Sequence, residues 1–188
     1  MEAPVDIDEV QPVDPMEDEY WSVPLRAAGI MNEKVGNDVA VLGCINSPML
    51  MASEMMGLEG MLMATVTDPD RVDHLLKVIL ESTKAYIEHL SSMGVEMAFV
   101  ENGTAGLEMN SQESIERFDT RSMKRAIDSF HSHGLKVIAH NCSQQPYLNG
   151  YVGMGADAVH FHLPAVDRDA TFAMLKGKTA VMAGIDHM

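Results

Sequence analysis

Short apolar runs alternate with longer stretches of helical periodicity along most of the chain. Five runs are rich in β-branched or small apolar residues and end in glycine or polar residues, as strands buried on both faces do. They cover residues 39–44, 95–101, 137–139, 155–161 and 179–186. The stretches between them are long enough for crossovers that join parallel strands. The pattern therefore predicts a parallel sheet covered by helices.

The helix predicted over residues 69–93 has the clearest pattern. It is preceded by Thr-Asp at 67–68, opens with Pro69 and carries an acidic residue in its first turn, as helix starts commonly do. Apolar residues then recur three and four positions apart until Gly94 ends the run. Residues 57–63 give no clear pattern. Further helices are predicted over residues 22–36, 48–56, 111–134, 146–154 and 167–175.

The alternation predicts an α/β fold in a single domain. With 188 residues the chain can bury a sizeable core, but it is shorter than the roughly 250 residues of a complete eight-stranded barrel. Residues 1–21 combine Asp, Glu and Pro with few large apolar side chains, which predicts an acidic, disordered arm. Residues 22–188 then form the domain, as an open doubly wound sheet or as part of a (β/α) barrel.

Composition excludes several classes of partner. The formal net charge is -15 and no basic stripe is present, which argues against nucleic acid and anionic membranes. No apolar run is long enough to span a membrane, and the acidic start does not resemble a secretory signal. The only cysteines, Cys44 and Cys142, suit a reducing compartment. We therefore expect a cytoplasmic protein whose cysteines are free thiols or metal ligands.

The strand over residues 137–139 runs into two potential metal ligands, His140 and Cys142. Side chains two residues apart on a strand project to the same face, and an imidazole with a thiolate is a ligand pair that zinc favours. The spacing alone equally fits a buried cysteine beside a core histidine. Other polar residues also follow strands, where ligands bind in such folds. They are Cys44, Glu101, Asn102, His160, His162 and Asp186.

Six short motifs occur in a fixed order along the chain. They are VAVLGCINSP at 39–48, DP at 68–69 before the long helix, GVEMAFVENGTAG at 94–106, VIAHNC at 137–142, GADA at 155–158 and VMAGID at 181–186. This series resembles the uroporphyrinogen decarboxylase superfamily, and within it most closely the zinc-dependent methylcobamide:coenzyme M (corrinoid) methyltransferases. The resemblance implies an incomplete parallel (β/α) barrel of the uroporphyrinogen decarboxylase type, with about five β/α units.

The resemblance also implies a chemistry. Proteins of this branch move a methyl group from a methylated corrinoid, carried by a partner protein, to a small thiol activated by zinc. By resemblance, His140 and Cys142 are the zinc ligands, while Glu101, Asn102 and Asp186 support the ligands or contact the substrate. The family completes its zinc site with a cysteine from a region that follows the strand ending at Asp186. Here Cys44 is the candidate for that missing ligand.

Two alternatives stay open. A uroporphyrinogen decarboxylase would need cationic anchors for its anionic tetrapyrrole, and Arg26 stands alone in its predicted helix. A non-catalytic partial barrel would instead bind a corrinoid protein or a second copy of itself. A partial barrel leaves two sheet edges and an apolar interior uncovered, so the sequence also predicts a homo-oligomer.

Overall fold

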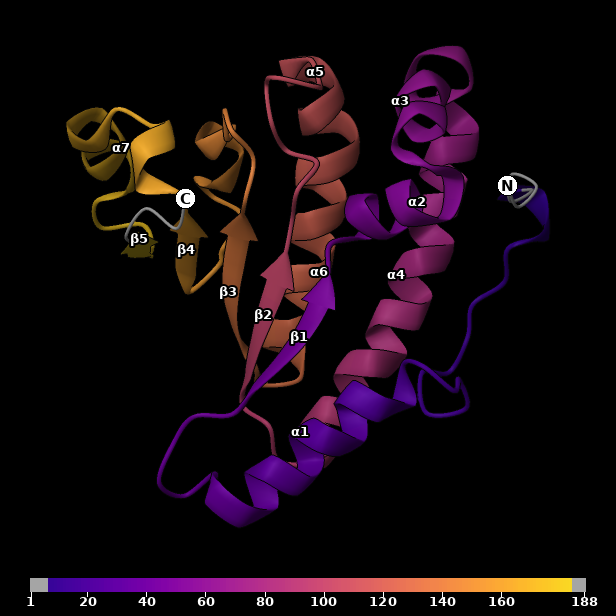
Figure 1. Cartoon of the computed structure of the whole chain (residues 1–188), viewed down its shortest axis with the longest axis vertical. Helices are drawn as coiled ribbons and strands as arrows, with labels where there is room; N and C mark the ends of the chain where they lie inside the picture. The colour runs from indigo at the N-terminus through magenta and orange to yellow at the C-terminus, as the bar shows by residue number, and fades with distance from the viewer. Residues whose placement is uncertain (1–6, 184–188) are drawn as a thin grey trace.

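The computed structural model describes residues 7–183 and has a single five-stranded parallel sheet (Figure 1). Its strands are β1 (Leu42–Asn46), β2 (Met97–Glu101), β3 (Lys136–Asn141), β4 (Ala158–Phe161) and β5 (Ala180–Ala183). Each strand pairs in parallel with the next one along the chain. A doubly wound sheet would reverse its strand order at a switch point, whereas a barrel keeps the order of the chain. The predicted incomplete (β/α) barrel is therefore confirmed, with β1 and β5 at its open edges.

The helices largely follow the predicted pattern. They are α1 (Ser22–Val35), α2 (Pro48–Met56), α3 (Leu58–Thr67), α4 (Pro69–Ser92), α5 (Gln112–Ser114), α6 (Arg121–Ser132) and α7 (Arg168–Leu175). Single turns of other helix types are η1 (Ile7–Glu9), the π-helical η2 (Ile115–Thr120), η3 (Leu148–Tyr151) and η4 (Leu163–Ala165). None of these helices in residues 7–183 combines the length and apolarity that a bilayer crossing needs.

Four local differences from the prediction have clear causes. The first strand starts at Leu42 rather than residue 39, because its partner β2 begins only at Met97 and leaves the earlier residues without a ladder. The helix predicted over 111–134 is interrupted by η2, and the one predicted over 146–154 is the single turn η3. Residues 58–63 belong to α3, which Gly57 separates from α2 by its positive φ of 75°.

The two faces of the sheet have different environments. One face carries side chains such as Ala98, Val100 and Val137, which are buried against helices. The helices α4 and α6 pack against each other and α6 packs against β3 (Figure 1). Most side chains of the opposite face are exposed or half-buried, with Ile138 and Ala158 as buried exceptions, and in a closed barrel this face would line the interior. We call it the open face; it includes Cys44, Phe99, Glu101, His140, His160 and Met182.

The segment 7–21 lies along α4 (Figure 1). Ile7 is buried, the N–H of Val13 donates to Oγ of Ser82 at 3.0 Å, and Asp14 lies 2.7 Å from His89. Composition alone predicts a disordered arm, because it does not reveal that these few side chains find partners on a distant helix. The division of the chain into an arm (1–21) and a domain (22–188) stays a prediction.

Candidate active site

His140 and Cys142 stand at the carboxyl end of β3. Val137 and Ala139 are fully buried on the helix side, whereas His140 is half-buried and Cys142 is exposed. This alternation is what an extended strand imposes on residues one apart. His140 thus lies on the open face, and Cys142 follows directly after the last residue of the strand, with its side chain exposed.

The imidazole of His140 is held by the neighbouring strand. Its Nδ1 lies 2.8 Å from Nδ1 of His160 and 3.3 Å from the backbone carbonyl oxygen of that residue. The ring of Phe99 contacts both imidazoles, with ring centroids 5.3 Å and 5.8 Å away. Burial lowers the pKa of His140 and the charge of His160 lowers it further, against opposing effects of the carbonyl and of Glu101. Burial also lowers the pKa of His160, so both rings are neutral at neutral pH.

Glu101 ends β2 on the same face and influences both thiols. Burial raises the pKa of Cys44, and the charge of Glu101 and a hydrogen bond with it raise that pKa further. Burial also raises the pKa of Cys142 against a backbone hydrogen bond, and the charges of Glu101 and Glu108 add to the increase. Both thiols are therefore protonated at neutral pH unless a cation binds nearby.

Asn102 is fully buried beneath the open face. Its Nδ2 donates to Oδ1 of Asp119 at 2.8 Å and to the hydroxyl of Tyr151 at 3.2 Å, and its Oδ1 accepts from the N–H of Thr104 at 2.9 Å. Its backbone carbonyl accepts from the N–H of Cys142 at 3.1 Å and lies 3.6 Å from Sγ. Of the two roles that the sequence allows for Asn102, this geometry favours support of Cys142 over contact with a substrate.

Asp119 is the buried centre of this network, and the sequence reasoning missed it. Only 2% of the residue is exposed, and Oγ1 of Thr104 donates to its Oδ2 at 2.7 Å. Burial raises the pKa of Asp119 to about 6, although the hydrogen bonds from Thr104 and Asn102 act in the opposite direction. A signal was present, because Asp119 follows Ile115 by four residues on the stripe predicted to face inward.

The donor set at the open face suits zinc, but it is incomplete within residues 7–183. A neutral imidazole and an accessible thiol are ligands that zinc accepts. In this part of the chain, however, no three His, Cys, Asp or Glu side chains lie close enough to hold a metal ion together. Cys44 shares the open face without forming such a group. Asp186 lies outside the described residues.

Comparison with known proteins identifies the family. The profile of the family described as Uroporphyrinogen decarboxylase (URO-D) matches residues 1–186. The chain belongs to the uroporphyrinogen decarboxylase family. This confirms the resemblance drawn from the six motifs.

Relatives within the uroporphyrinogen decarboxylase family are methyltransferases. The methylcobamide:CoM methyltransferase MtaA of Methanosarcina barkeri (strain Fusaro / DSM 804) is 24% identical over 109 residues, which are 58% of this chain and 32% of that protein. A second MtaA of Methanosarcina barkeri is 22% identical over 120 residues, which are 64% of this chain and 34% of that protein. The matched regions thus span about a third of the length of these relatives.

A solved structure supports the family fold. A methyltransferase from Methanosarcina mazei superposes on 96% of this chain with a TM-score of 0.85 and 18% sequence identity. The match covers 53% of that protein, so this chain spans about half of its length. The partial barrel of this chain therefore has the fold of the corresponding part of a methyltransferase.

Proposed function

We propose that this chain acts as a methyltransferase that moves a methyl group from a methylated corrinoid to a small thiol activated by zinc. The observation that supports the proposal is that His140 on the open face and the exposed Cys142 just after β3 both lie within the electrostatic reach of Glu101. The names of the two relatives from Methanosarcina barkeri support the same reaction class.

In this proposal His140 and Cys142 hold the metal. Bound zinc would supply a positive charge that keeps an incoming thiol in its thiolate form. The lowered pKa of His140 keeps its ring neutral and so able to ligate, and the Asn102 carbonyl fixes the backbone of Cys142. Glu101 adds a negative charge that favours a cation on this face. A third ligand is still required, for which Cys44 is the candidate from this chain.

The methylated corrinoid would arrive on a partner protein that docks at the open face. Exposed apolar side chains on this face, including Leu42 and Met182, support docking of another protein or of a second copy of this chain. A homo-oligomer therefore remains our prediction, and light scattering at micromolar concentration checks it. The free thiols Cys44 and Cys142 support a reducing, cytoplasmic location.

Decarboxylation of a tetrapyrrole has weaker support. Its polyanionic substrate needs cationic anchors, whereas Glu101 places a negative charge at the open face. Arg26 is exposed on α1. Assay of the same purified protein with uroporphyrinogen separates this reaction from methyl transfer, since only the former releases carbon dioxide.

Metal analysis tests the proposal most directly. We expect about one zinc ion per chain after loading and dialysis, and its loss in both His140→Ala and Cys142→Ser. His131→Ala is the matched control. Cys44→Ser tests the third ligand, and retention of zinc in that variant would assign the third ligand to another group. Methyl transfer from free methylcobalamin to small thiols is then measured for the same variants. Equal zinc content in the His140 and Cys142 variants and the unmodified chain would refute the proposal.

A further inference from the structure

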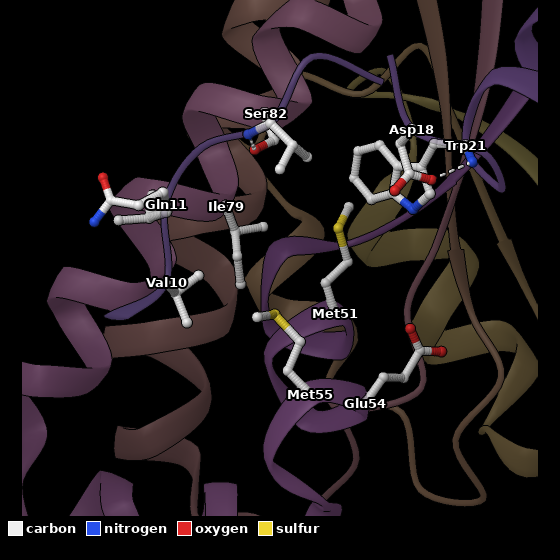
Figure 2. Close-up of a pocket in the computed structure, with 11 residues that line it drawn as sticks. Val10, Gln11, Asp18, Trp21, Met51, Glu54, Met55, Ile79 and Ser82 are labelled. Carbon is white, nitrogen blue, oxygen red and sulfur yellow. Dashed lines mark hydrogen bonds between the residues drawn. The ribbon is translucent and has the colours of Figure 1, made fainter. Parts of the chain in front are cut away.

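A cavity of about 380 Å³ lies between the amino-terminal segment and the helices α2 and α4 (Figure 2). Val10 and Val13 of the segment form one wall, Met51 and Met55 of α2 another, and Ile79 of α4 a third. The volume falls in the range of small-molecule sites. The hydrogen bond from the N–H of Val13 to Ser82 fixes the wall that the segment provides.

The charges around this cavity all have one sign. The residues of 7–183 that line it include the carboxylates Asp18 and Glu54 and no Lys, Arg or His. Oδ1 of Asp18 accepts from the backbone N–H groups of Tyr20 and Trp21 at 2.9 Å and 2.8 Å, which orients the side chain. Oε1 of Glu54 accepts from Nδ2 of Asn46 at 2.9 Å. Within residues 7–183 neither carboxylate forms an ion pair with a basic side chain.

An aromatic ring completes the polar end of the cavity. Trp21 lines it next to Asp18 (Figure 2). An edge-on contact with Tyr86, at a centroid distance of 6.3 Å, fixes the indole. The face of an indole attracts cations, and the thioethers of Met51 and Met55 offer polarizable apolar surface. The cavity therefore joins negative charge, an indole ring and an apolar floor.

We propose that this cavity binds a small organic cation. Its ammonium group lies near Trp21, Asp18 and Glu54, and its apolar part contacts Met51, Met55 and Ile79. An anionic ligand would face two carboxylates, and a neutral ligand would displace their water without replacing its interactions. Among the three kinds of small molecule, only the cation matches both the charge and the ring.

The site borders the open face of the sheet. A second cavity of about 200 Å³, which Cys44 and Tyr86 help to line, shares Trp21, Met51 and Glu54 with the first. The cation site thus adjoins the carboxyl end of β1 without using His140 or Cys142. The inference is consequently independent of the proposed metal chemistry, and either can fail without the other.

Trp21 makes the test direct, because it is the only tryptophan of the chain. The full 188-residue chain is titrated with benzyltrimethylammonium, with its neutral isostere neopentylbenzene and with the anion phenylacetate, while tryptophan fluorescence is followed. We expect a saturable fluorescence change with the cation and no saturation with the anion. The affinity for the isostere should be at least about fivefold weaker than the affinity for the cation. Equal affinity for cation and isostere, or no saturable signal from the cation in fluorescence and calorimetry, would overturn the proposal.

Conservative variants identify the charges responsible. Asp18→Asn keeps an oxygen that accepts the N–H groups of Tyr20 and Trp21, and Glu54→Gln keeps the bond to Asn46. We expect each variant to weaken the affinity for the cation about two- to fivefold and to leave the affinity for the neutral isostere unchanged. Glu113→Gln, at an exposed carboxylate outside both cavities, is the matched control. Unchanged cation affinity in both pocket variants would contradict the assignment, and thermal unfolding verifies that all variants fold.

Discussion

Nδ1 of His140 lies 3.3 Å from the backbone carbonyl oxygen of His160 and 2.8 Å from its Nδ1. A carbonyl oxygen only accepts hydrogen bonds, so a hydrogen bond to it forms only when His140 carries its proton on Nδ1. In that tautomer the lone pair of the neutral ring lies on Nε2, where a metal can be bound. The register of β3 and β4, which pairs these two residues, brings this acceptor to the ring of His140.

Removal of the His160 ring tests whether this neighbour positions His140. We expect His160→Ala to weaken zinc affinity about tenfold, because His140 loses the ring that contacts its Nδ1 at 2.8 Å, while the backbone carbonyl is retained. Competition with a chromophoric chelator measures the affinity. His74→Ala, at an exposed position of α4, serves as the control. Zinc affinity that is equal in both variants would show that His160 does not position His140.

Glu101 and Glu108 affect the two thiols differently. Glu101 raises the pKa of both thiols, whereas Glu108 acts on Cys142. In a Cys142→Ser background, we therefore expect Glu101→Gln to speed alkylation of Cys44 by iodoacetamide about threefold at pH 8, and Glu108→Gln to leave it unchanged. In a Cys44→Ser background both substitutions should speed alkylation of Cys142. If the alkylation rates do not respond to Glu101→Gln in either background, Glu101 does not lie close enough to the two thiols to affect them.

The buried Asp119 predicts an unusual dependence of stability on pH. Its pKa is raised to about 6 in the folded protein, above the ordinary value of 3.8, so the folded state binds more protons between these values. The free energy of unfolding therefore falls as pH rises from about 4 to about 6, by about 3 kcal/mol from this group alone. Urea unfolding at closely spaced pH values measures the slope.

Asp119→Asn isolates that contribution. The amide oxygen can still accept from Asn102, and the amide nitrogen can donate to Thr104, whose hydroxyl also accepts. We expect the variant to lose the stability decrease between pH 4 and pH 6, whereas Asp119→Ala should lose about 1–3 kcal/mol at every pH because Asn102 and Thr104 each lose a buried hydrogen-bond partner. An unchanged pH slope in Asp119→Asn would assign the dependence to other groups.

Two glycines test how tightly the helices cover the sheet. A Cβ at Gly43 would collide with the side chain of Leu90 on α4, whereas a Cβ at Gly60 in α3 would meet nothing within 4 Å. We expect Gly43→Ala to destabilise the protein by about 1–3 kcal/mol and Gly60→Ala to stabilise it by about 0.5–1 kcal/mol. Chemical unfolding of both variants under one condition compares them. A neutral Gly43→Ala would indicate that α4 can move away from β1 at little cost.

The sequence predicts those parts of the fold that depend on local patterns. The long helix α4 follows from its capping residues and apolar spacing, and the alternation of strands and helices predicts a parallel sheet. The position of His140 on the open face, opposite to buried Val137 and Ala139, follows from strand geometry alone. Each of these features is set within a few residues along the chain.

The features that the sequence does not predict depend on distant partners. The start of β1 is set by where β2 begins, and Val13 gains its fixed position only from Ser82 on α4. The network of Asp119 joins residues from three separate segments, so a single polar residue on an apolar stripe gives only a weak indication of it. The contact between His140 and His160 likewise requires the register of two strands.

The strand order of the sheet has a consequence for how the chain assembles. Each strand pairs with the next strand along the sequence. The hydrogen bonds between two strands therefore form as soon as one β/α unit has been added, without residues from the far end of the polypeptide. Such short closures cost little chain entropy, and they allow the sheet to grow one unit at a time during synthesis on the ribosome. In a parallel barrel that forms in this way, each new unit pairs with the strand formed just before it.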